Sequence, residues 1–328
     1  MKPDALRELE PDFWRAPSAR NTQPWVLRYH EDSVEIGWDP SRTLPALDPT
    51  GRDLRLALGA FTETCLIVCA DAGLRVDFRQ DHSGAHRRVG YLVAAGGRYP
   101  APYTTPFTAQ DVRDRRTARG PYEPGRLDDA VAGRLEKLAV EEKAEVRRVP
   151  SRELIGLAED AERHLYCTPS VVREARAWLR LDPEDPRYEQ DGLNSRVLGL
   201  SRREARALER ALSSRWYPLR RRLGRVPRLL ASSARRTLDY DGEVFVLVGR
   251  PGCTDGEQVA LGRVLMRQWL TLSTLGYATH PLSQLIGVET IKQRLARLLG
   301  VDDPSRLLHV ARVGRPKTAP PPSARLRP

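Results

Sequence analysis

A short proline-bounded segment near the start of the chain carries side chains that could bind a polar ring. Residues 16–25 read Ala-Pro-Ser-Ala-Arg-Asn-Thr-Gln-Pro-Trp, so Ser18, Asn21 and Gln23 lie within a few residues of one another. Their hydroxyl and amide groups supply both donors and acceptors of hydrogen bonds. A flavin ring needs such groups, because its polar edges must be hydrogen-bonded once they leave water.

A second segment could bind an anion. Residues 115–119 read Arg-Arg-Thr-Ala-Arg, which places three guanidinium groups and one hydroxyl within five residues. Arginine binds phosphate through forked, charge-assisted hydrogen bonds. Taken alone, the cluster is better explained as part of a solvated surface.

The two segments together resemble a known family. The string at residues 16–25 is similar to the PSxxNxQPW motif of the nitroreductase family, and the string at 115–119 resembles its RRSxR phosphate motif. A late Thr-His-Pro-Leu-Ser-Gln loop at 279–284, the strand that reaches residues 312–316 and an arginine-bearing tail also have counterparts there. The resemblance covers nearly the whole chain, and within the family it is nearest to the long, single-chain, Acg-like proteins of actinobacteria.

The resemblance implies a set of contacts to flavin mononucleotide (FMN). The phosphate would be bound by Arg115, Arg116 and Arg119, with Thr117 assisting. The ring and the ribityl chain would be contacted by Ser18, Asn21 and Gln23, and backbone amides at Leu282 and Ser283, which follow Pro281, would approach the N5 and O4 edge. Arg325 in the tail is expected to close over the phosphate. Two roles stay open for Arg20, which either reaches FMN or points into the substrate cavity.

Each half of the chain keeps only one of the two motifs. Ordinary family members are homodimers whose chains each carry both motifs, with two FMN sites at the interface. Here no arginine motif precedes residue 15, and the second half reads Glu-Glu-Lys-Ala-Glu at 141–145, where the asparagine motif would follow. We therefore expect one composite FMN site, with phosphate contacts from the second half and ring contacts from the first.

The expected function is that of an FMN-dependent oxidoreductase. By the resemblance, NAD(P)H would deliver a hydride to the flavin, and a small planar acceptor would then take its place: a nitroaromatic, a quinone or an intermediate of a biosynthetic pathway. No side chain stands out as a proton donor. The alternative is an FMN-binding or flavin-sequestering protein whose pocket is covered by a lid, for which residues 187–236 are the candidate.

An internal repeat supports the two-half organisation. Leu58-Gly59 opens an apolar helical stretch that ends at Gly73, and Leu261-Gly262 opens another that ends at Gly276, with the same offset of 203 residues in both cases (262 − 59 and 276 − 73). Both stretches are apolar over most of their circumference, which indicates burial on several sides. Two such helices could pack against each other as in a dimer.

The remaining pattern predicts an α+β fold with a nitroreductase-like arrangement. Strands are expected around 76–78, 89–93, 244–248 and 307–313, and helices at 127–138, 153–165, 171–181 and 291–299. We expect a first half at 1–105 and a second half at 106–328, which together form an internal pseudo-dimer around buried central helices. If each half is the dimer partner of the other, the protein should be a monomer.

Composition excludes several other classes of function. The net charge of +11 suggests nucleic-acid binding, but only five of the 54 basic residues are lysine, which is typical of a general arginine bias. Twelve arginines lie in 201–236, where a solvated amphipathic helix is the simpler interpretation. The four cysteines form no disulfide or metal pattern, and Cys65 and Cys69 are expected to be buried. No membrane span or signal segment is expected, so the default location is cytoplasmic.

Overall fold

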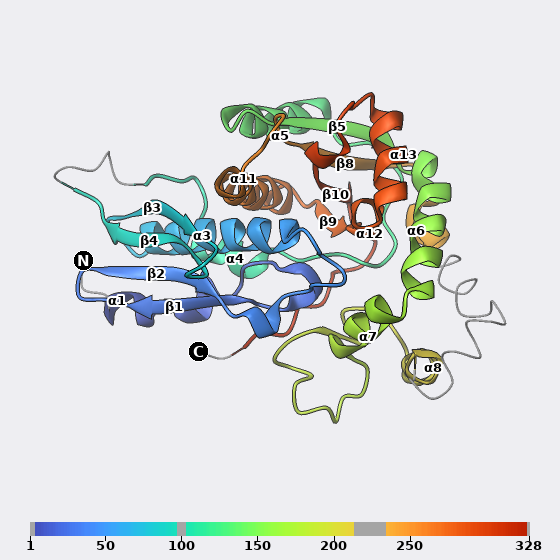
Figure 1. Cartoon of the computed structure of the whole chain (residues 1–328), viewed down its shortest axis with the longest axis horizontal. Helices are drawn as coiled ribbons and strands as arrows, with labels where there is room; N and C mark the ends of the chain where they lie inside the picture. The colour runs from blue at the N-terminus through green and yellow to red at the C-terminus, as the bar shows by residue number, and fades with distance from the viewer. Residues whose placement is uncertain (1–3, 97–102, 213–233, 327–328) are drawn as a thin grey trace.

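Two long helices form the centre of the protein. The computed structural model describes residues 4–96, 103–212 and 234–326, and in it helix α3 (Arg52–Asp71) packs along helix α11 (Asp255–Thr274) (Figure 1). Their closest approach is at Gly59 and Gly262, where a Cβ atom added to either glycine would lie 2.8–2.9 Å from the Cα of the other. The duplicated, buried helices expected from the 203-residue repeat are therefore confirmed.

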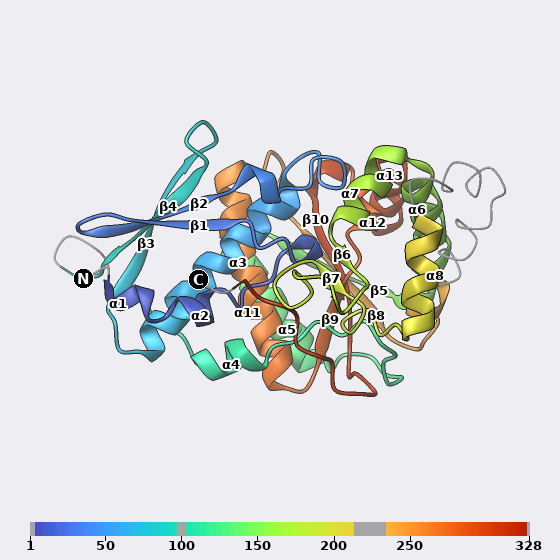
Figure 2. The same cartoon turned by 90° about the horizontal axis from the view of Figure 1, so that it is seen from below.

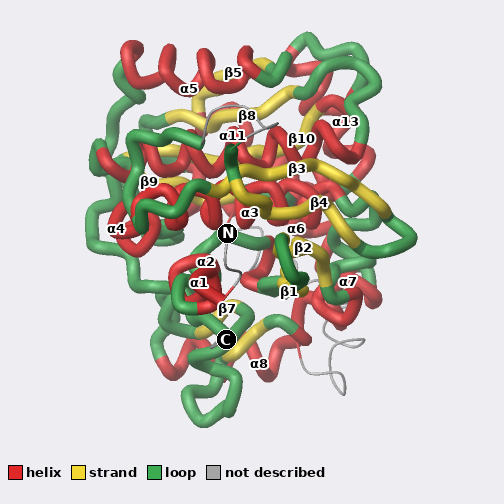
Figure 3. Tube along the Cα trace, turned by 90° about the vertical axis from the view of Figure 1, so that its left-hand side faces the viewer, coloured by secondary structure: helices red, strands yellow, loops and turns green. Residues whose placement is uncertain are grey.

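Each central helix is accompanied by a four-stranded antiparallel sheet. The first sheet has the order β1-β2-β4-β3, from β1 (Trp25–Tyr29), β2 (Ser33–Trp38), β3 (Val76–Ser83) and β4 (Arg88–Ala94). The second has the order β5-β8-β10-β9, from β5 (Glu145–Pro150), β8 (Glu243–Val248), β9 (Ala278–Pro281) and β10 (Leu307–Gly314). In each half the first two strands precede the central helix and the last two follow it, so the two sheets have the same topology. In Figure 2 the helix pair lies between the two sheets, and Figure 3 shows β5 above the pair and β1 below it.

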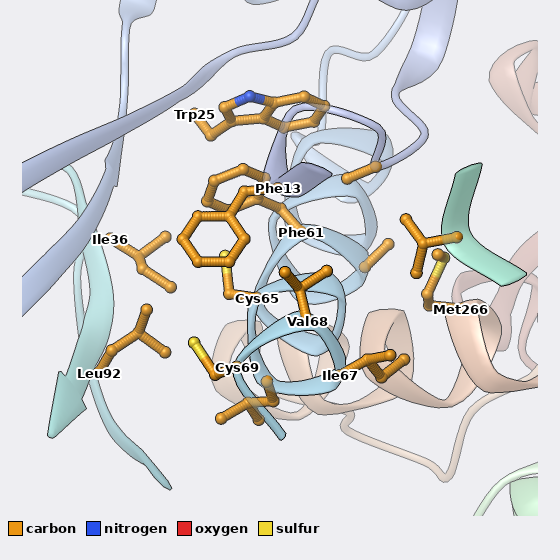
Figure 4. Close-up of a cluster of buried hydrophobic side chains, with 14 of the residues drawn as sticks. Phe13, Trp25, Ile36, Phe61, Cys65, Ile67, Val68, Cys69, Leu92 and Met266 are labelled. Carbon is orange, nitrogen blue, oxygen red and sulfur yellow. The ribbon is translucent and has the colours of Figure 1, made fainter. Parts of the chain in front are cut away.

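The first core shows why the proline-bounded segment is fixed in place. Trp25 stacks on Phe61 of α3, with ring centroids 4.7 Å apart and planes 13° apart, and Phe13 is buried beside them (Figure 4). Cys65 and Cys69 are buried in the same cluster, as expected. A second core lies between the second sheet and the helices that cover it.

The second half carries a large insertion. In the first half, β1 and β2 are joined by a tight turn at residues 30–32. In the second half, the equivalent strands β5 and β8 are separated by α6 (Ile155–Cys167), α7 (Pro169–Ala177), α8 (Arg202–Leu212) and the two-residue parallel strands β6 (Leu179–Arg180) and β7 (Leu193–Asn194). These helices gather at one end of the molecule (Figure 2).

Shorter elements surround this frame. The first half begins with α1 (Asp4–Arg7) and α2 (Glu10–Phe13), and the second half begins with α4 (Ala109–Asp114) and α5 (Asp129–Glu141). After β9 come α12 (Gln284–Gly287) and α13 (Glu289–Leu299), which ends at Gly300 in the left-handed conformation (φ +65°). Short 3₁₀ turns lie at Ala19–Asn21, Pro40–Arg42, Ser151–Leu154 and Pro304–Arg306.

Most elements expected from the sequence are present, and their bounds differ in a few places. The mixed α+β fold and the strands around 76–78, 89–93, 244–248 and 307–313 are confirmed. The helix expected at 171–181 is wrong at its end, because the chain leaves α7 after Ala177 and pairs as β6 with β7. Of the candidate lid at 187–236, residues 213–233 lie outside the described part of the chain. Within the described ranges, no helix combines the length and apolarity needed to cross a lipid bilayer.

Candidate functional site

A cavity of about 380 Å³ lies where the two halves, the insertion and the C-terminal tail meet. This volume lies within the range of small-molecule sites. Residues 17–21 and 115–119 both border it, as do the loop after β9 and the tail near Arg325. Segments separated by as many as 300 residues in sequence therefore border a single space. Helix α3 contributes Asp53, Leu56, Ala57 and Ala60 to the lining, and the two alanines leave room for a flat ligand.

The lining of the cavity is strongly cationic. Arg115, Arg119 and Arg325 all border the cavity, and within the described residues Nε and Nη1 of Arg115, Nη1 of Arg119 and Nε of Arg325 have no hydrogen-bond partner. Arg325 lies near Arg115, whereas Arg119 lies near Arg20 and His280. Burial lowers the pKa of Arg115 and of Arg119 to about 10, and that of Arg325 to about 9, with repulsion from neighbouring arginines adding to the effect. Buried guanidinium groups with free donors need an anion beside them. The end of the cavity at Arg115 and Arg325 is therefore suited to a phosphate.

Thr117 and Arg116 of the arginine segment differ in their position relative to the cavity. Thr117 borders the cavity and pairs with Thr279 in an isolated β-bridge. Arg116 does not border it, and its Nη1 donates to the carbonyl oxygens of Arg113 and Arg115, the latter at 3.0 Å. The guanidinium of Arg116 thus supports the backbone of the segment from outside the cavity.

The asparagine–glutamine segment has an unusual backbone. Arg20, Asn21 and Gln23 all have positive φ, between +51° and +55°, although none of them is glycine. Such conformations cost energy and persist where surrounding contacts impose them. Here Ser18 Oγ accepts a hydrogen bond from the Gln23 amide (2.9 Å), which closes the turn.

The amides of this segment bind other segments of the protein. Asn21 Nδ2 donates to the carbonyl oxygens of Gly192 (3.2 Å) and Ala324 (2.9 Å), and Asn21 Oδ1 accepts from Arg325 Nη1 (2.9 Å). Asn21 thus joins the insertion and the tail, and it also borders the cavity.

Gln23 has the same joining role from a position behind the cavity. It does not border the cavity, its Nε2 donates to the carbonyl of Gln190 (2.8 Å), and its Oε1 accepts from the Leu326 amide (2.9 Å). The tail is held further by Arg325 Nη2, which donates to the carbonyl of Arg15 (2.9 Å). The insertion, the first half and the tail are therefore joined at one point.

The loop that follows β9 forms another wall. Pro281, Leu282 and Ser283 border the cavity, and the Leu282 amide is already bonded to the carbonyl of Val310 (2.8 Å). His280, just before the loop, accepts a hydrogen bond from Arg312 Nε at its Nδ1 (3.2 Å). Burial, reinforced by Arg312 and Arg119, keeps the pKa of His280 well below its usual value, so the ring is neutral with its proton on Nε2.

The floor of the cavity contains a second buried histidine. His309 of β10 lies beside Trp269 of α11, with ring centroids 5.5 Å apart, and burial lowers its pKa to about 4. Its Nε2 has no hydrogen-bond partner among the described residues. His309 was not among the predicted site residues, because nothing in its local sequence separates it from an ordinary strand position.

The insertion supplies another part of the cavity lining. Ala158, Glu162 and Leu165 of α6 border the cavity, together with Leu193 and three residues of the helical stretch at 234–238, namely Ala234, Thr237 and Leu238. Arg20 lies near this part of the lining, since it acts electrostatically on both Glu162 and Arg119. Part of the candidate lid therefore does border the cavity, and α6, which precedes it in sequence, contributes as well.

Comparison with known proteins points to one family. No protein-family model matches the chain. A 59-residue stretch is 41% identical to proteins of two Mycobacterium tuberculosis strains that are named as NAD(P)H nitroreductases; it covers 18% of this chain but only 17% of each relative. A Serratia protein named as the NAD(P)H nitroreductase PigM is 22% identical over 300 residues, which cover 87% of this chain and 82% of that protein. These names support the nitroreductase family at this coarse level.

Solved nitroreductases also align with the structure, at low similarity. Nitroreductase A of Vibrio parahaemolyticus matches with a TM-score of 0.36 and 10% identity, over 67% of this chain and 69% of that one. The FMN-dependent nitroreductase NfnB of Mycobacterium smegmatis, solved with NADPH, matches with a TM-score of 0.33 and 16% identity, over 63% and 86%.

Proposed function

We propose that the protein binds one FMN in this cavity and is an NAD(P)H-dependent oxidoreductase of the nitroreductase type, with a small planar molecule as electron acceptor. The observation that carries the proposal is the set of unpaired guanidinium nitrogens of Arg115, Arg119 and Arg325, three residues that border the cavity. A dianionic phosphate would supply acceptors to Arg115 and Arg325, which lie near each other. The nitroreductase names of the relatives agree with this reading.

The residues around the cavity fit the remainder of FMN. Ala57 and Ala60 leave a flat wall for the ring, and Trp269 adds an aromatic surface. Ser18, Arg20 and Asn21 would border the ring and the ribityl chain, while the loop at Pro281–Ser283 would meet the opposite ring edge. Arg116, Thr117 and Gln23 would shape the site, Thr117 from the cavity wall and the other two from behind it.

The bound flavin would supply the redox chemistry, by accepting a hydride from reduced nicotinamide and passing it to the acceptor. The chain would contribute binding, orientation and charge. The cationic end would stabilise negative charge on the ligand, and the apolar walls of α3 and α6 would exclude water from the reacting face.

A single flavin per chain is supported by what lies at the pseudo-symmetric position. The 203-residue offset makes Arg263 the counterpart of Ala60, and Arg263 donates to the buried carboxylate of Glu63 (2.8 Å), which also accepts from the Tyr103 hydroxyl. This cluster occupies the helix surface that would have to stay open for a second ring. A buried carboxylate there would also repel a phosphate.

The same features support a self-contained chain of two halves. Residues 1–105 and 106–328 would each supply one sheet and one central helix, so that the pair of halves replaces a dimer. The matching strand order of the two sheets and the Gly59–Gly262 contact support this division. This organisation favours placing the protein with the Acg-like subgroup, in which one chain takes the place of two.

The second candidate function is a flavin-sequestering protein without nicotinamide turnover. It is favoured by the wall that α6, Leu193, Ala234, Thr237 and Leu238 add to the cavity. If that wall leaves no room above the ring, a nicotinamide cannot stack there.

Anaerobic titration separates the two candidates. The purified flavin-bearing protein would be treated with NADH, then NADPH, and finally dithionite, with the visible flavin absorbance recorded after each addition. Rapid loss of absorbance with either nicotinamide is the result that the proposal predicts. A flavin that only dithionite reduces would contradict the oxidoreductase and support sequestration.

A further inference from the structure

A carboxyl group on the inserted helix borders the cavity without a partner. Glu162 of α6 is half-buried at the cavity wall, and no described residue forms a hydrogen bond with its carboxyl group. Other carboxylates of the same helix are paired, since Glu159 accepts from Arg235 Nε (2.8 Å) and Asp160 accepts from Arg294 Nη1 (2.6 Å). Glu162 is thus the residue of α6 whose acid group is left free for a ligand in the cavity.

The surroundings of Glu162 are mostly apolar. Ala158 and Leu165 lie on the same face of α6, one turn away on either side, and Leu193 borders the same space. Burial raises the pKa of Glu162 to about 7, against a smaller opposing effect of Arg20. A carboxyl group of this kind holds its proton near neutral pH and can release it, as a general acid–base residue must.

Few charged groups compete for this carboxyl group. Arg20 is the charged residue that acts on it from the first half. From α13, which packs on α6, Arg294 is engaged by Asp160. On α7, Glu174 accepts from the amides of Ala46 and Leu47 and does not border the cavity. Helix α12 carries no charged residue.

The other titratable groups that border the cavity with Glu162 belong to different walls or are neutral. They are Asp53, Arg115, Arg119, Tyr166, His280 and His309, in addition to Arg325 of the tail. Both histidines are held neutral by burial. The arginines are the buried cations of the cavity lining, and Asp53 accepts two hydrogen bonds from Arg52, at 3.0 and 2.8 Å.

We propose that Glu162 is the acid–base residue of the cavity and gives a proton to the electron acceptor during its reduction. The proposal rests on the proposed function, since reduced FMN supplies the hydride. For a quinone acceptor, the hydride would leave the N5–H bond of reduced FMN and bond to one quinone oxygen, while the Glu162 O–H bond would break and its proton would join the other oxygen. Two electrons would pass from reduced FMN to the quinone, which would become a hydroquinone, and the Glu162 carboxylate would regain a proton from solvent.

The test measures reoxidation of the reduced flavin alone, so that it does not depend on the electron donor. Flavin-bearing wild type and Glu162→Gln would be reduced with dithionite and mixed anaerobically with menadione in a stopped-flow instrument from pH 5.5 to 9. Wild-type reoxidation should slow as pH rises through about 7, because the protonated acid is lost. The Glu162→Gln protein should be slower by about 10²-fold at pH 6 and should lack this pH dependence.

Two further variants separate proton transfer from structure. Glu162→Asp keeps the acid and should restore the pH-dependent step in part, while Glu153→Gln makes the same substitution at an exposed position before α6 and should behave as wild type. Infrared difference spectra of wild type against Glu162→Gln, without flavin, should show a carboxyl group that titrates near neutral pH.

The possible outcomes are distinct. Equal rates and equal pH profiles in wild type and Glu162→Gln would overturn the proposal, as would a slower variant that keeps the wild-type pH profile or a carboxyl group that titrates below pH 5. If the protein binds no FMN, both the proposed function and the role of Glu162 are wrong. A flavin-bearing protein with an unaffected Glu162→Gln variant would remove only the role of Glu162.

Discussion

At the scale of single residues, the cavity is distinguished by buried arginine side chains. Arg115 is buried, contacts the face of Trp269 at 5.5 Å, and has two nitrogens without a partner in the described chain. Such a group destabilises the flavin-free protein and stabilises a complex in which an anion meets it. Affinity for the ligand and stability without it should therefore change in opposite directions when the charge is removed.

Arg115→Met tests this relation. Since a hydrogen bond to a charged group contributes about 1.5–3 kcal/mol, FMN affinity should fall about 10- to 100-fold. The flavin-free variant should be at least as stable as wild type in urea unfolding, because an unpaired buried charge is gone. The control is Arg126→Met, at an exposed position, where neither quantity should change. Unchanged FMN affinity in Arg115→Met would argue against an anion at this end.

The residues of the site differ in how far sequence could reveal them. Ser18, Asn21 and Arg115 were found because they belong to short motifs with fixed spacing, and all three border the cavity. Their individual roles toward FMN stay predictions. Glu162 and His309 could not be found in this way, because each reaches the cavity only through the packing of α6 or β10 and neither has a distinctive local sequence.

At the scale of elements, the crossing of α3 and α11 depends on two glycines. A Cβ atom on Gly262 would lie 2.3 Å from the Leu56 carbonyl oxygen, which is closer than packed atoms can approach. Gly133 in α5, by contrast, has open space around its Cβ position. The contact between α3 and α11 therefore has no room for a side chain at Gly262, whereas α5 has room for one at Gly133.

Gly262→Ala and Gly133→Ala form a matched pair. Gly262→Ala should destabilise the protein by about 1–3 kcal/mol or more through overpacking, whereas Gly133→Ala should stabilise it by about 0.5–1 kcal/mol through helix propensity. Urea unfolding curves measure both changes. Equal effects of the two substitutions would show that the close contact of the central helices does not limit stability.

Asn21 is one of the residues that join the tail to the first half. Asn21→Ala removes the hydrogen bonds to Gly192, Ala324 and Arg325, so trypsin should cut after Arg325 faster, and FMN should bind about tenfold more weakly from the loss of a roughly 1.4 kcal/mol contribution. Mass spectrometry of timed digests measures the cleavage. Asn21→Asp keeps the acceptor for Arg325, so its cleavage rate and its FMN affinity should lie between those of Asn21→Ala and wild type. An unchanged cleavage rate in Asn21→Ala would contradict this joining role.

Element-level prediction from sequence succeeded where periodicity was strong. The apolar repeat identified α3 and α11, and the helix predicted at 291–299 corresponds to α13. Strands β1 and β2 were missed because each is short and they are separated by a three-residue polar turn. The end of α7 was misplaced because the pairing of β6 with β7 is a tertiary contact that overrides local helix propensity.

At the scale of the whole molecule, one chain contains what resembles two subunits. The equal strand order of the two sheets and the contact of their helices account for a molecule that needs no second copy to bury its centre. Sequence indicated this from a constant offset of 203 residues, but it could not show that Arg263 and Glu63 fill the position symmetric to the cavity. That cluster makes the two pseudo-symmetric positions unequal. We therefore expect a monomer that binds one flavin.

The most direct test of the account is the flavin content per chain. Protein would be saturated with FMN, freed of excess by gel filtration with light scattering, and denatured so that released FMN can be measured against protein concentration. We expect a monomer of about 37 kDa with one FMN. Two FMN per chain would rule out a single composite site, and a monomer that retains no FMN would show that the cavity does not bind it.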